Sequence, residues 1–122
     1  MRQLGTDEQT RSSTLTHLQD QDTTKIIIMT LPEITRVREA TALQDELQRA
    51  GITPWAWIMN QSLNGLDPAS GLLRMRAGGE VLHLHHVRDD LATRSAMVPL
   101  QRIEPRGVSG LARLSERKLT RI

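Results

Sequence analysis

The chain has 122 residues, carries a formal net charge of +2 and contains no Cys, Phe or Tyr. Its length suits one domain rather than two, and the lack of Cys excludes disulfides and thiolate metal sites. No apolar run approaches the length of a membrane span, and the polar first ten residues lack the apolar stretch of a secretory signal, so we expect a cytoplasmic protein.

The first half of the chain reads as a polar lead-in followed by a strand, a helix and a second strand. Residues 1–24 are polar with little periodicity, which predicts a poorly ordered segment with at most one helical turn. The nearly continuous apolar run at 25–31 is typical of a strand that is buried on both faces of a sheet. Apolar residues at helical spacing predict a helix over 33–50, which Gly51 ends. The next apolar run predicts a strand over 53–60.

The second half continues the alternation of helices and strands. A helix is predicted over 72–91, a short strand over 95–100 and a last helix over 108–119. Short connections between strand, helix and strand favour parallel pairing. We therefore predict that residues 25–122 form a three-layer α/β unit with a partial doubly wound, mostly parallel sheet. In such a fold, ligands bind beyond the carboxyl ends of the strands.

Two common catalytic motifs are absent from the sequence. A phosphate-binding loop needs closely spaced glycines and a Lys followed by Ser or Thr, whereas Lys25 precedes Ile26 and Lys118 precedes Leu119. The serines also lack the G-x-S-x-G pattern of a nucleophile elbow. These 122 residues are therefore not expected to catalyse nucleotide hydrolysis alone.

A histidine cluster is the sharpest local feature. On a helix, His83, His86 and Asp90 would share one face at spacings of three and four residues. Two imidazoles and a carboxylate can bind zinc or nickel. The alternative is a solvent-facing cluster on a surface helix, and we assign no metal site.

Asn60 stands at the carboxyl end of a predicted buried strand. Its amide offers both a donor and an acceptor, so it could match the edge of a purine base. The alternative is an Asn that satisfies local backbone groups in a turn.

The last part of the chain is basic. Residues 102–122 hold six cations and two acids, a net charge of +4. This tail could contact phosphate or anionic lipid, or it could be the solvated end of a helix. Aromatic residues for base stacking are almost absent, so we expect no nucleic acid partner.

Several segments, in order, resemble the arsenical pump-driving ATPases, and more distantly the ATPases that deliver tail-anchored proteins to membranes. The resemblance covers about residues 14 to 114 and rests on these stretches: Thr30-Leu31-Pro32-Glu33, Arg49-Ala50-Gly51-Ile52, Pro54-Trp55-Ala56-Trp57-Ile58, Asn60-Gln61-Ser62-Leu63 and Leu72-Leu73-Arg74-Met75-Arg76-Ala77.

The resemblance implies a fold and a function. The family is built on paired, deviant phosphate-loop α/β domains, and its ATPase activity drives arsenite or antimonite export through a membrane pump, which confers arsenic resistance. This chain is similar to the C-terminal part of one such domain. By this likeness Asn60 and Gln61 would contact adenine, and Pro99 and Leu100 would belong to the loop that closes over the base.

The chain also departs from the family. The phosphate loop, the magnesium-binding aspartates and the metalloid-binding cysteines of the family have no counterpart in this sequence. We therefore expect a truncated, non-catalytic product with a weak, partial ATP site and no magnesium ligands. The alternative is an interaction module that pairs with a complementing phosphate-loop chain or with a second copy of itself.

Overall fold

The structure, a computed structural model, describes residues 2–67, 69–117 and 119–122. The helices are α1 (Arg2–Gln19), α2 (Ile34–Arg49), α3 (Gly71–His86) and α4 (Gly107–Ser115). A π-helical turn, η1 (Val87–Leu91), continues α3. The strands are β1 (Ile27–Thr30), β2 (Ala56–Ser62), β3 (Ser95–Pro99) and β4 (Thr120–Arg121).

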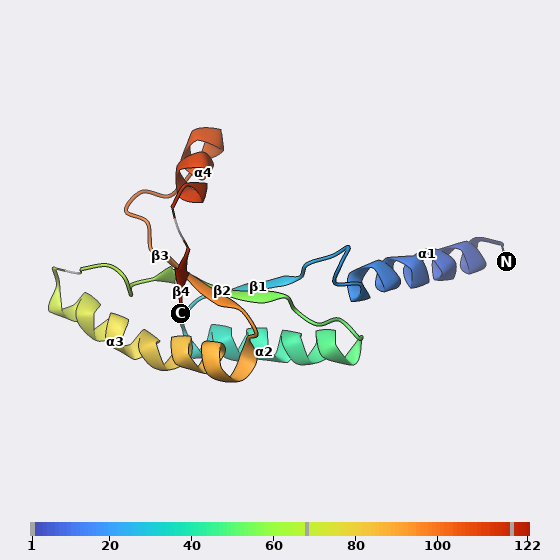
Figure 1. Ribbon diagram of the computed structural model, residues 1–122, viewed down its shortest axis with the longest axis horizontal. Helices are drawn as coiled ribbons and strands as arrows, with labels where there is room; N and C mark the ends of the chain where they lie inside the picture. The colour runs from blue at the N-terminus through green and yellow to red at the C-terminus, as the bar shows by residue number, and fades with distance from the viewer. Residues whose placement is uncertain (1, 68, 118) are drawn as a thin grey trace.

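The four strands form one sheet in the order β1-β2-β3-β4 (Figure 1). The first three strands are parallel, and the short β4 runs antiparallel to β3. The predicted α/β class with a mostly parallel sheet is therefore confirmed. The predicted helix over 108–119 instead ends at Ser115, and the chain returns to the sheet as β4.

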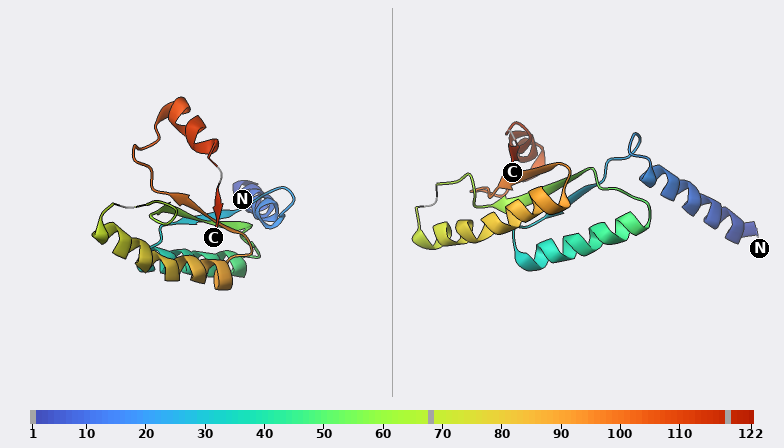
Figure 2. Two further views of the ribbon diagram at one scale, coloured as in Figure 1. Left: turned by 60° about the vertical axis from the view of Figure 1, so that its left-hand side comes forward. Right: turned by 60° about the horizontal axis from the view of Figure 1, so that its bottom comes forward.

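Helices α2 and α3 cover the same face of the sheet (Figures 1 and 2). Both connect parallel neighbours, and the chain moves across the sheet in one direction from β1 to β3. Crossovers of this kind are almost always right-handed, so successive helices fall on the same side. Helix α4 lies on the opposite side and stands away from the sheet.

The core lies between the sheet and the two helices. Trp57 and Met59 of β2 are its largest fully buried side chains. Gln44 of α2 accepts a 2.7 Å hydrogen bond from Nε1 of Trp57 and donates one of 3.1 Å to the carbonyl of Leu91. This buried amide joins α2, β2 and η1. The core cluster consists of Ile28, Val37, Ala40, Trp57, Met59, Leu84, Val87 and Met97.

The sequence predicts that β1 is buried on both faces of the sheet. In the structure it is buried on one face only. Ile28 and Thr30 point into the core, whereas Ile27 and Met29 are 47% and 60% exposed. The reason is that, among the described residues, β1 pairs only with β2 and neither α2 nor α3 lies on this face. An apolar sheet face and a free strand edge therefore lie side by side.

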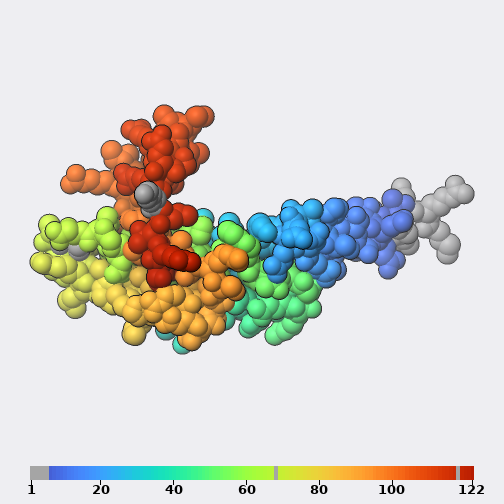
Figure 3. Space-filling model, viewed as in Figure 1, coloured from blue at the N-terminus to red at the C-terminus, as the bar shows by residue number. Residues whose placement is uncertain are grey.

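Helix α1 differs from the single helical turn predicted within residues 1–24. It spans 18 residues and projects from the body of the molecule (Figures 1 and 3). The hydroxyls of Thr10, Thr14 and Thr16 donate to carbonyls four residues earlier, so these polar side chains are satisfied within the helix. The division into a lead-in and residues 25–122 stays a prediction. Among the described residues, no helix is long and apolar enough to cross a membrane.

Candidate functional site

The candidate site lies where β2 ends and the chain after β3 passes beside it. Strand β2 contains one extra residue here, because Met59 pairs with Met97 while Ser62 pairs with Pro99. Gln61 takes up this irregularity with a φ of 55°, a left-handed backbone conformation that few non-glycine residues adopt. The two amide residues predicted from the sequence, Asn60 and Gln61, therefore sit in a bulge rather than in a regular strand.

The carboxylate of Glu80, on α3, holds the turn after this bulge. Its Oε2 accepts hydrogen bonds of 2.9 Å from the Ser62 hydroxyl, 2.9 Å from the Leu63 amide and 3.1 Å from the Asn64 side chain. Asn64 also donates to the carbonyl of Ala77 on the same helix. Charged acceptors make stronger hydrogen bonds than neutral ones, so Glu80 is the main polar link between α3 and the end of β2.

The loop after β3 is held against the same turn. The Leu100 amide donates a 2.8 Å hydrogen bond to the carbonyl of Ser62. The Gln101 side chain donates back to the carbonyl of Pro99 at 2.6 Å, which shapes the start of the loop. The structure therefore places Pro99 and Leu100 beside the end of β2.

A cavity of about 300 Å³ lies between the ends of β1 and β2 and helix α3. Gln61 and Leu100 both line it, together with Leu31, Glu80 and Arg76. Gln61 is exposed, so its amide is free to meet a ligand. The cavity is at the low end of the size range of small-molecule sites.

Asn60 does not line this cavity. It lies half-buried in a neighbouring groove of about 520 Å³ along the free edge of β1, with Ile27, Met29 and Leu43. The two neighbouring amide residues of the bulge therefore line different hollows. The four predicted adenine contacts are therefore not in one place. Gln61 and Leu100 line the cavity, Pro99 precedes Leu100 in the chain, and Asn60 lines the groove.

The apolar and amide side chains of this cavity suit the base of a nucleotide, whereas Arg76 can pair with a phosphate. Leu31 and Leu100 offer apolar contact, and the Gln61 amide offers both a donor and an acceptor for a base edge. The described residues bring no three His, Asp or Glu side chains together as a metal site.

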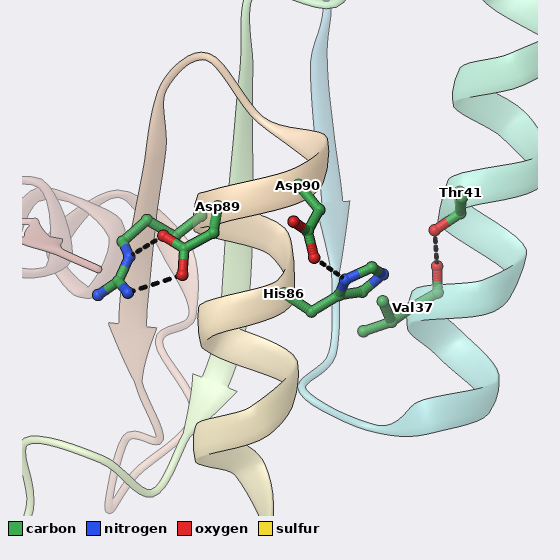
Figure 4. A network of polar contacts seen from close by, with 6 residues as sticks. Val37, Thr41, His86, Asp89 and Asp90 are labelled. Carbon is green, nitrogen blue, oxygen red and sulfur yellow. Dashed lines mark hydrogen bonds and ion pairs between the residues drawn. The ribbon is translucent and has the colours of Figure 1, made fainter.

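The histidine cluster forms a pair rather than a trio. His86 Nδ1 lies 2.7 Å from Asp90 Oδ2 at the surface, as Figure 4 shows. His83 lines the cavity beside Glu80. Next to the pair, two hydrogen bonds from the Arg88 guanidinium hold the pKa of the Asp89 carboxyl below its ordinary value of 3.8.

Glu80 has no sequence signal that would have marked it. It is a single acidic residue that follows two glycines inside a helix, and its partners lie 16 to 18 positions away in the chain. The sequence does not predict the left-handed conformation of Gln61 either, because Gly, Asn or Asp is the usual residue in that conformation.

No protein-family model matches the chain. Arsenical pump-driving ATPases do match it: one from Escherichia coli is 48% identical over 98 residues, and one from Acidiphilium multivorum is 47% identical over 97 residues. Each match covers 80% of this chain and 17% of the relative. The chain is therefore homologous to a segment of the arsenical pump-driving ATPases and spans about a sixth of their length.

Proposed function

We propose that this chain, a homologue of a segment of arsenical pump-driving ATPases, supplies one side of an adenine pocket in the cytoplasm and does not hydrolyse ATP by itself. The observation that supports this most directly is the Leu100–Ser62 hydrogen bond, which joins the loop after β3 to the end of β2. The phosphate loop would come from another polypeptide segment. In this proposal the complete assembly drives arsenite or antimonite export with a membrane pump.

The proposed pocket is lined by residues from two segments, the end of β2 and the loop after β3. Gln61 reads the edge of the base, and Leu100 packs against its plane. Asn60 lines the neighbouring groove, and in this proposal the base extends past the end of β2 far enough to meet its amide as well. A base alone, without phosphate contacts, binds weakly, because backbone N–H groups and a Lys supply much of the affinity for nucleotides.

Adenosine and ATP binding to the purified chain tests this proposal by calorimetry and by the thermal melt. We expect dissociation constants of about 1 mM or weaker, near −4 kcal/mol, for both ligands. Gln61→Ala and Asn60→Ala should each weaken binding, whereas Gln48→Ala on the exposed side of α2 should not. Micromolar ATP binding, or binding that neither site variant changes, would contradict the proposal.

A second candidate function rests on the open face of the sheet. Ile27 and Met29 are exposed apolar residues next to the free edge of β1, a surface that invites pairing with another strand. In this alternative the chain is an interaction module that docks on a phosphate-loop chain or on a second copy.

Met29→Glu tests this alternative in a mixture with the phosphate-loop part of a relative. We expect the substitution to abolish co-elution with that partner, or self-association if the partner is a copy. Met75→Glu on α3, where Met75 is 76% exposed, is the matched control and should leave association intact. Equal loss in both variants would refute a specific role for the open face.

A further inference from the structure

A second cavity lies on the other side of the β3 loop, between residues 101–106 and α4. Its volume is about 460 Å³, and four arginines line it: Arg102, Arg106, Arg113 and Arg117. Among the described residues that line it, Glu104 is the only acidic one, so these residues carry a net charge of +3. The four arginines lie within residues 102–117 and line one cavity because α4 packs against the loop that precedes it.

Most of this positive charge has no carboxylate partner. Arg106 makes hydrogen bonds of 2.9 and 2.6 Å with Glu104, which neutralises one of the four arginines. Arg113 donates only to the carbonyl of Ser109 on its own helix. Within the described ranges, no Asp or Glu forms an ion pair with Arg102, Arg113 or Arg117.

Close contact between the helix and the loop shapes the cavity. A Cβ added at Gly110 would lie 3.2 Å from the carbonyl carbon of Pro105 and 3.3 Å from its Cα, so α4 rests directly on the loop backbone at this point. A larger residue at 110 would push α4 outward and change the spacing of the arginines without changing their charge.

The chemistry of the lining favours one class of ligand. Guanidinium groups bind phosphoryl oxygens through paired N–H donors, and like charges that surround one cavity are stabilised when an anion enters it. No aromatic side chain lines the cavity, so it offers no stacking for a base. Its volume lies in the range of small-ligand sites.

We propose that this cavity is a binding site for a multiply charged phosphate anion, separate from the cavity that Gln61 lines. Arg102, Arg113 and Arg117 would contact the phosphoryl oxygens, and Arg106 would exchange part of its pairing with Glu104 for the ligand. The phosphate could belong to a free polyphosphate or to the headgroup of an anionic lipid, which share this chemistry.

Calorimetric titration with inorganic tripolyphosphate at low salt tests the site in the full chain. Arg102→Gln combined with Arg117→Gln should weaken binding about tenfold or more, because two unpaired guanidinium groups are lost. Arg11→Gln combined with Arg38→Gln removes the same charge from α1 and α2 and should have little effect. Gly110→Val keeps every charge and should also weaken binding, because it displaces α4. Circular dichroism confirms that each variant is folded.

A parallel measurement of binding to lipid vesicles identifies the source of the phosphate. Binding of tripolyphosphate that requires Arg102 and Arg117 supports the proposal with a free ligand. If tripolyphosphate fails but vesicles containing phosphatidylglycerol bind, with the same dependence on both arginines and no binding to neutral phosphatidylcholine, the proposal holds for a lipid headgroup. Failure of both probes, or an equal loss in the control pair, would overturn it.

Discussion

Removing the carboxylate of Glu80 should loosen the candidate site more than any other single truncation on α3. In Glu80→Ala, the buried Leu63 amide loses its acceptor, at a cost of about 1–3 kcal/mol. The buried Ser62 hydroxyl loses its acceptor as well, and the half-buried Asn64 adds little. We expect a loss of about 3 kcal/mol in the free energy of unfolding, a large share of the stability of a small domain.

Urea unfolding followed by tryptophan fluorescence measures this loss, because Trp57 is buried in the core. Glu80→Gln keeps one acceptor oxygen without the charge and should cost about 1 kcal/mol. Glu46→Ala, at an exposed position of α2, controls for removing an acidic residue from a helix. If Glu80→Ala costs less than about 1 kcal/mol, the reasoning that this carboxylate holds the turn is wrong.

Two further substitutions probe polar contacts of the structure. Gln44→Leu leaves the buried Nε1–H of Trp57 without a partner and should lower the free energy of unfolding by about 2–4 kcal/mol in the same urea assay. An unchanged free energy of unfolding would contradict a stabilising role for the Gln44–Trp57 hydrogen bond. Arg88→Gln should raise the pKa of Asp89 toward 3.8 in an NMR titration. Because the folded pKa is lowered, the pair stabilises the fold above about pH 4 and this contribution is lost as the pH falls. An unchanged Asp89 pKa would show that the contact is absent in solution.

The sequence predicts the central β-α-β unit well because its signals are local. The apolar run before Thr30, the helical spacing of apolar residues and the stop at Gly51 each specify one element, and α2 begins and ends within one residue of its predicted bounds. The predicted helix over 72–91 is also found, although its last five residues form the π-helical turn η1.

The parts that the sequence does not predict depend on distant partners. Burial on one face of β1 depends on which side the connecting helices take, and an apolar run has no period that reports this. The contacts of Glu80 join positions 16 to 18 residues apart through a turn that has no distinctive composition. Helix α1 lacks an apolar stripe, so the pattern that identifies surface helices is missing.

The bulge in β2 has a consequence for how the chain tolerates changes in length. Met59 and Ser62 are three positions apart on β2, whereas their partners Met97 and Pro99 are two positions apart on β3. Deleting one residue between them would remove the bulge and leave Ser62 two positions after Met59, so Ser62 would stay on the same face and opposite Pro99. The extra residue therefore serves the candidate site rather than the sheet: a deletion of Gln61 should leave the pairing of β2 with β3 intact while it removes the left-handed turn and the amide that line the cavity.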